Sequence, residues 1–196
     1  NNIMTALYAF VVISFFITIV DIIIRFPLQS EMIDYNDIQA IVINVLALLI
    51  QIVFFAYGFV NAIRGMLSPK RMGAVIVAFF AATCITGTGN MVINSNVQIV
   101  LWWIVLIIPN IVGAVATFAY FVSGKKSKIY SIIIYLAAIW GMFRIIYSNY
   151  NLIVHANQYL SMNSTVRLVL GIAIHCLVIY QTYVLWIKRQ NAIDIS

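Results

Sequence analysis

The chain has 196 residues, of which 64% are hydrophobic and 8% are charged, and its formal net charge is +6. A soluble domain keeps roughly 25% charged residues, so this composition excludes an ordinary water-soluble protein, and no basic run carries the interleaved aromatic residues of a nucleic-acid binder. The apolar runs are continuous and exceed the roughly 20 residues that cross a bilayer as a helix, which predicts an all-α polytopic membrane bundle rather than a β-barrel.

Six apolar runs predict a single transmembrane domain, residues 1–196, with about six membrane-spanning helices. In chain order, the predicted spans are 3–26, 38–63, 72–93, 98–122, 129–153 and 166–187. The first link between spans carries three acids, the second and fourth links are basic, and the third and fifth are rich in asparagine.

Basic residues follow alternate helices. Eight of the eleven Lys and Arg lie in three clusters: Arg64, Lys70 and Arg71; Lys125, Lys126 and Lys128; Lys188 and Arg189. Under the positive-inside rule, this pattern places both chain ends in the cytoplasm (N-in/C-in) and the acidic first link outside. We therefore expect a multi-pass protein of the plasma membrane.

Each span carries polar residues at helical spacing, which places them on one stripe of the helix. The stripes are Ser14, Thr18, Asp21 and Arg25; Asn44, Gln51, Gly58 and Asn61; Thr83, Thr86, Asn90 and Asn94; Asn110, Gly113 and Thr117; Trp140, Arg144, Tyr147 and Asn151; Arg167, Gly171, His175 and Thr182. Polar residues inside a membrane normally face protein or a wet cavity, so we expect a partly polar interior. Small and hydroxyl residues at such positions also hold helices together by close approach and hydrogen bonds across the interface.

The charged residues inside the spans are harder to explain as helix-packing residues than the small and hydroxyl residues are. Asp21 and Arg25 lie one turn apart and can partly neutralise each other. Arg144 lies deep in the fifth span without an acid nearby in its own helix. It either pairs with Asp21 or is held for an anionic ligand group, because guanidinium suits carboxylate and phosphate. His175, at the middle of the sixth span, is a core residue, a proton-relay group or a ligand contact.

The depth of the polar residues favours an outward-opening pocket over a continuous pore, because polarity is concentrated in the outer half and the centre. The candidate ligand-binding residues are Asp21, Asn44, Gln51, Asn90, Asn110, Arg144 and His175. No spacing of His, Cys and carboxylates resembles a metal site, no cofactor is indicated, and Cys84 and Cys176 are expected to be packing residues.

Pro109 and Asn110 lie side by side in the fourth span. Proline cannot donate a backbone hydrogen bond, so Pro109 frees a carbonyl one turn earlier, near Val105, and kinks the helix. Such a break is tolerated only where protein or water satisfies the freed group. We expect this pair to form the floor of the pocket or the hinge beneath it, with a kinked packing helix as the alternative.

No catalytic or nucleotide-binding motif is present, which disfavours an enzyme, although an Arg, a His and an Asp could act together. The favoured function is a subunit that binds and helps to transport a small anionic or polar solute, working in the lipid bilayer with energising membrane subunits. The alternatives are a membrane-embedded sensor or receptor-like module and a structural or accessory subunit.

The length of about 200 residues, the six predicted helices and the cytoplasmic ends are similar to the substrate-binding S components of energy-coupling factor transporters. The resemblance is architectural and covers the whole chain. The small-residue pattern AxxxA, by which such subunits dock their partner, is absent from "IMTALYAFVVISFF" in the first span. The resemblance implies a solute-binding subunit and assigns no residue.

Overall fold

The computed structural model describes residues 2–29, 35–93, 103–149 and 162–194, and all the regular structure in these ranges is helical. The helices are α1 (Asn2–Gln29), α2 (Tyr35–Ile63), α3 (Pro69–Ile93), α5 (Ile108–Thr117), α6 (Lys128–Ser148) and α9 (Met162–Asp194). Helix α5 continues at both ends into π-helical segments, η2 (Trp103–Ile107) and η3 (Phe118–Val122). Six helices are long and apolar enough to cross a membrane, which confirms the predicted helical bundle and indicates a multi-pass membrane protein.

Helices that are consecutive in the chain are neighbours in space, and α9 closes the ring by packing against α1. Helices α3 and α9 also touch across the middle. The bundle therefore contains two groups of four helices that share α3 and α9. One group is completed by α1 and α2, and the other by α5 and α6.

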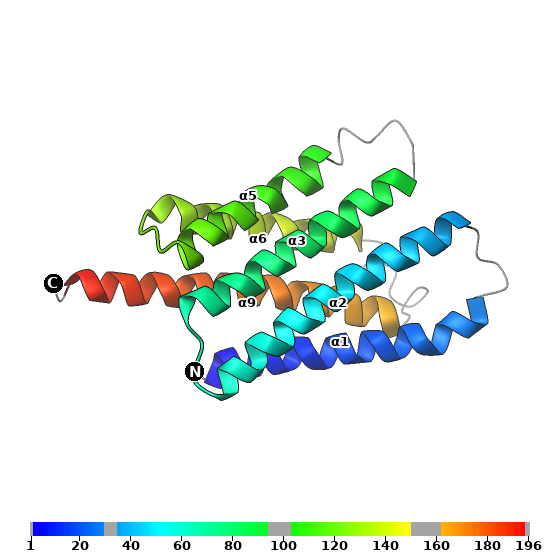
Figure 1. Ribbon diagram of the computed structural model, residues 1–196, viewed down its shortest axis with the longest axis horizontal. Helices are drawn as coiled ribbons and strands as arrows, with labels where there is room; N and C mark the ends of the chain where they lie inside the picture. The colour runs from blue at the N-terminus through cyan, green and yellow to red at the C-terminus, as the bar shows by residue number, and fades with distance from the viewer. Residues whose placement is uncertain (1, 30–34, 94–102, 150–161, 195–196) are drawn as a thin grey trace.

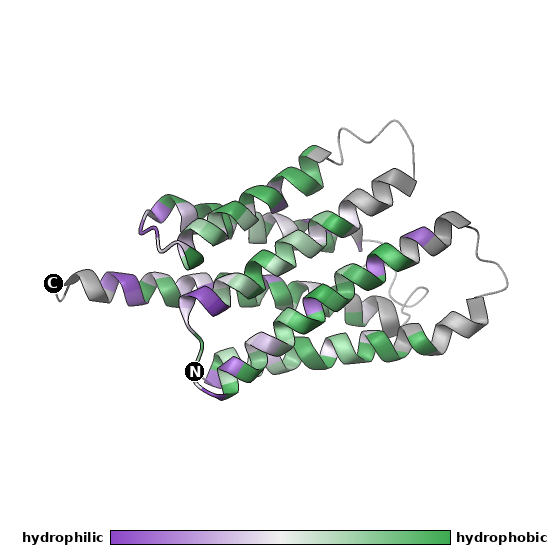
Figure 2. Ribbon diagram, viewed as in Figure 1, coloured by the Kyte–Doolittle hydropathy of each residue, from purple (hydrophilic) through white to green (hydrophobic). Residues whose placement is uncertain are grey.

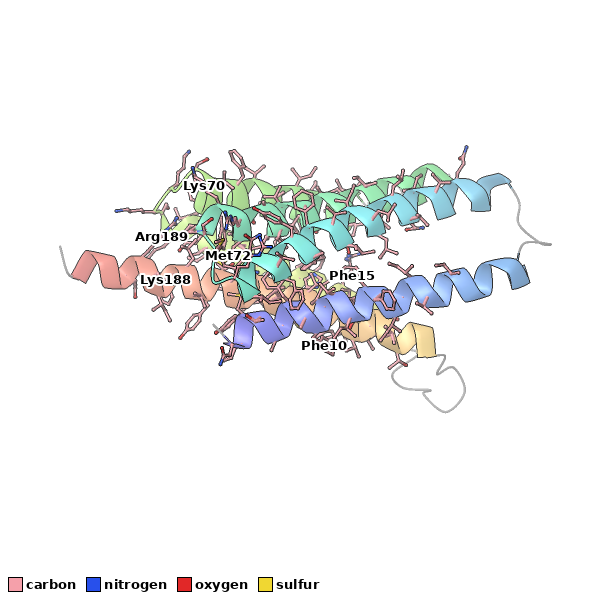
Figure 3. The ribbon with its side chains drawn as sticks, turned by 60° about the horizontal axis from the view of Figure 1, so that its bottom comes forward. Phe10, Phe15, Lys70, Met72, Lys188 and Arg189 are labelled. Atoms are coloured by element: carbon pink, nitrogen blue, oxygen red, sulfur yellow. The ribbon has the colours of Figure 1, made fainter. Side chains whose placement is uncertain are left out.

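The buried face of α1 shows how the sequence positions a helix in this bundle. Met4, Tyr8, Val11 and Phe15 are buried, and their spacing of four, three and four residues places them on one stripe. Phe15 is 2% exposed whereas Phe10 is 45% exposed, and Figure 3 shows them on opposite sides of the helix. Hydrophobic residues occupy the exposed sides of the helices as well as the sides buried in the bundle. Hydrophilic residues gather at the end of the bundle where the two chain ends lie (Figure 2). This distribution suits helices whose outer surfaces face lipid.

Helices α1, α2 and α9 meet in a tightly packed region. Tyr8 is fully buried and lies directly against Gly58 of α2, where an added Cβ would overlap with the tyrosine ring. Gln181 of α9 is also fully buried and donates a hydrogen bond from its side-chain amide to the Tyr8 hydroxyl. Glycine at position 58 therefore lets α2 approach the ring that links α1 to α9.

Candidate functional site

The helical segment around Pro109 is linked to α6 by the side chain of Trp140. In an α-helix the Val105 carbonyl would accept a hydrogen bond from the backbone N–H of residue 109, which Pro109 lacks. The indole N–H of Trp140, on α6, donates to the Val105 carbonyl at 2.7 Å. A neighbouring helix therefore supplies a donor to the carbonyl that Pro109 cannot bond.

Asn110, the next residue, forms a hydrogen bond within its own helical segment. Its side-chain amide donates to the Leu106 carbonyl at 2.6 Å, and the residue is buried. Leu106 in turn packs so closely against Gly87 of α3 that a Cβ at position 87 would overlap with it. The turn that precedes the Pro109–Asn110 pair therefore contacts both α3 and α6, while the kink and the pocket floor expected there stay predictions.

His175 lies in a closely packed niche between α3, α6 and α9. Its Nδ1 is 2.7 Å from the Gly171 carbonyl oxygen, which can only accept, so Nδ1 donates and the neutral ring presents Nε2 as an acceptor. The Phe79 ring lies edge-on at 5.0 Å between ring centroids. The Nε2 atom faces Gly141 of α6, where an added Cβ would overlap with it. The ring is 3% exposed, so its packing, like its hydrogen bond, holds it in one orientation.

Arg144 follows Gly141 by one turn of α6 and is half-buried. Gly141 lies against His175 Nε2, so Arg144 is one helical turn away from that contact. Within the described part of the chain, its guanidinium makes no hydrogen bond or ion pair. All five acids of the sequence, Asp21 included, occupy positions whose side chains are not described. The predicted alternative of an Asp21–Arg144 pair therefore lies outside the described residues and stays a prediction.

The other candidate residues lie farther from this group or outside the description. Asn44 is exposed and Gln51 is half-buried on α2, which packs mainly against α1 and α3 rather than α6. The side chains of Asp21 and Asn90 are not described. Of the seven candidates, the structure therefore brings together Arg144 and His175.

The polar stripe predicted for the fifth span does not face the interior along its whole length. Trp140 is 40% exposed and Tyr147 is 74% exposed. Both rings stack on the Phe143 ring: the centroid of Trp140 lies 5.9 Å from that of Phe143, and the centroid of Tyr147 lies 6.2 Å from it. The buried face of α6 instead contains Ser131, Ile134, Ala138 and Gly141. The prediction was wrong for the two aromatics, because a Trp or Tyr ring has an apolar body that lipid accommodates.

Several hydroxyl groups also bond differently from the prediction. Thr18, Thr117 and Thr182 are buried at helix contacts, as expected for residues that allow close approach. Each donates to the carbonyl four residues earlier in its own helix: Ser14, Gly113 and Val178. Their donated hydrogen bonds therefore satisfy the hydroxyls locally and do not link neighbouring helices.

The Tyr8–Gln181 pair was not among the predicted residues. Gln181 directly precedes Thr182, which the sixth-span stripe did include, so a glutamine inside a span was the available signal. Its side-chain oxygen has no hydrogen-bond partner among the described residues. The pair lies toward the end of the bundle that carries the basic clusters. The interior at that end is therefore less apolar than expected.

The group formed by Trp140, Gly141, Arg144 and His175 offers one cation, while the imidazole acceptor lies against Gly141. A guanidinium binds carboxylate or phosphate through paired hydrogen bonds. The described residues contain no group of three His, Cys, Asp or Glu side chains that could hold a metal ion. No protein-family model, curated protein or solved structure matches the chain.

Proposed function

We propose that the chain is the solute-binding subunit of a membrane transporter and that Arg144 recognises an anionic group of the solute. The observation that carries this proposal is the position of Arg144, half-buried in an apolar helix and one turn after Gly141, which contacts His175. Arg144 lies one turn before the end of α6 (Lys128–Ser148), and charged residues within a membrane-spanning segment normally face protein, a water-filled cavity or a partner of opposite charge. An anionic ligand would be such a partner and use the guanidinium geometry.

The packing of the bundle supports entry of the solute to Arg144 from one side of the membrane. Toward the basic clusters, Tyr8, Gly58 and Gln181 close the space between α1, α2 and α9. Arg144 and His175 lie nearer the opposite end. With the N-in/C-in orientation proposed from the basic clusters, that opposite end faces the outside of the plasma membrane. The solute then enters from outside, and energising subunits complete the transport cycle.

The second candidate is an accessory subunit that docks on other membrane proteins. The stacked Trp140, Phe143 and Tyr147 rings favour it, because they form an exposed aromatic face on α6. Under this alternative, Arg144 and Asp21 neutralise each other and bind no ligand.

A thermal-unfolding experiment distinguishes the two functions. The purified protein is heated with a panel of small carboxylates and organic phosphates, and R144Q and R144K are measured in parallel. A solute-binding subunit is stabilised by at least one anion, R144Q loses that response while keeping a cooperative transition, and R144K retains part of it. No response to any anion, together with non-additive losses of stability in D21N, R144Q and the double variant, favours the accessory function.

A further inference from the structure

Two arginines brace the loops at one end of the bundle. The Arg71 guanidinium donates to the Asn61 side-chain oxygen at 2.8 Å and to the Met66 carbonyl at 2.7 Å, which holds the loop between α2 and α3. The Arg189 guanidinium donates to the Lys125 carbonyl at 3.1 Å and to the Tyr120 carbonyl at 2.7 Å. It also lies over the Tyr120 ring, 4.2 Å from its centroid. Both loops are therefore held in place by half-buried guanidinium donors.

The remaining cations of this end are exposed, and the Lys125 ammonium lies over the Tyr130 ring, 5.8 Å from its centroid. They form what we call the basic surface, made of the exposed residues Arg64, Lys70, Lys125, Lys126, Lys128 and Lys188. Lys70 and Lys188 lie at the same end as Arg189 in Figure 3. No acid side chain is described on this surface, and Asp194, in the last turn of α9, is the one acid that the sequence places near it. The basic surface therefore concentrates positive charge on two loops and on the adjoining ends of α3, α6 and α9.

The position of the basic surface determines which anion can reach it. Lys128 is the first residue of a helix apolar enough to span the membrane, and Lys70 is the second residue of another. The loops that precede these two helices are short. The lysines in the loops and at the helix starts therefore lie at the depth of the lipid headgroups, where long side chains extend toward phosphate. A soluble partner would have to displace those headgroups.

We propose that the basic surface binds the phosphate headgroups of anionic phospholipids. Lys125 and Lys126 of the loop before α6, and Lys128 at the start of α6, supply point charges, and Arg189 holds the loop that leads into them. This inference is independent of the solute site, because it concerns the opposite end of the bundle.

Titration with short-chain phosphatidylglycerol in a neutral detergent tests the proposal, with short-chain phosphatidylcholine and inorganic phosphate as parallel probes. The triple variant K125Q/K126Q/K128Q should bind phosphatidylglycerol roughly 100-fold more weakly than wild type, because each cation near an anionic surface contributes about fivefold. The matched triple variant with arginine at the same positions should bind as wild type does, and added salt should weaken both.

Three outcomes would overturn the proposal. One is equal affinity for phosphatidylglycerol and phosphatidylcholine. Another is unchanged phosphatidylglycerol binding in both the glutamine triple variant and K70Q/K188Q. The third is binding of inorganic phosphate as tight as that of the lipid, which would make the surface a site for free anions. The six positions are exposed, and an unchanged unfolding midpoint in detergent shows that the substitutions leave the fold intact.

Discussion

Replacing Trp140 by Phe should destabilise the bundle through one backbone carbonyl. The substitution removes the indole N–H that reaches the Val105 carbonyl at 2.7 Å and keeps an aromatic ring to stack on Phe143. A half-buried acceptor left without a donor costs about 1–3 kcal/mol, whereas interhelical hydrogen bonds in membranes average about 0.6 kcal/mol with a maximum near 1.7. We therefore expect W140F to lower the free energy of unfolding by about 1–2 kcal/mol.

The variant P109A provides the decisive comparison, because alanine restores the N–H that an α-helix would direct to the Val105 carbonyl. W140F should then cost less than about 0.5 kcal/mol in the P109A background. The four proteins are compared by equilibrium unfolding in mixed micelles of neutral detergent and sodium dodecyl sulfate. Equal losses on W140F in both backgrounds would refute the assignment of Trp140 to the carbonyl freed by Pro109.

Three further substitutions test the packing of the bundle. Y8F should cost more than Y8F/Q181L, because the single change leaves a buried carboxamide without its partner and the double change removes both polar groups; simple additivity in unfolding measurements would contradict this. G141A should cost about 1–3 kcal/mol, since its methyl group overlaps with His175 Nε2, and an unchanged unfolding midpoint would show that the contact is absent. R189K should lower the midpoint because lysine lacks the paired donors that hold the adjacent loop; a midpoint equal to wild type would argue against that bracing.

Hydropathy was sufficient to predict the helices, because a membrane helix must satisfy its backbone internally and carry a long apolar surface. Local chemistry also predicted the unpaired carbonyl near Val105, since the missing N–H of Pro109 acts within one turn. The donor could not be predicted in the same way. Trp140 lies on another helix, and its identity depends on how α6 is rotated against α5.

Helix rotation also explains the errors at the candidate site. Periodicity places Trp140, Arg144 and Tyr147 on one stripe but does not show which way that stripe turns, and the packing of Gly141 on His175 decides it. The Tyr8–Gln181 hydrogen bond joins the first and last helices, and nothing in either local sequence specifies the other. Long-range pairing of this kind depends on the closure of the ring by α9.

Native mass spectrometry of the gently purified protein tests the solute-binding function most directly. The wild-type protein should retain a small anionic molecule, visible as a discrete mass added to the chain and released on activation. R144Q, purified in the same way and folded by its unfolding transition, should lack that mass. Retention of the same molecule by R144Q, or a wild-type protein that carries only lipid and detergent under conditions that preserve its fold, would contradict the assignment of Arg144 to a solute.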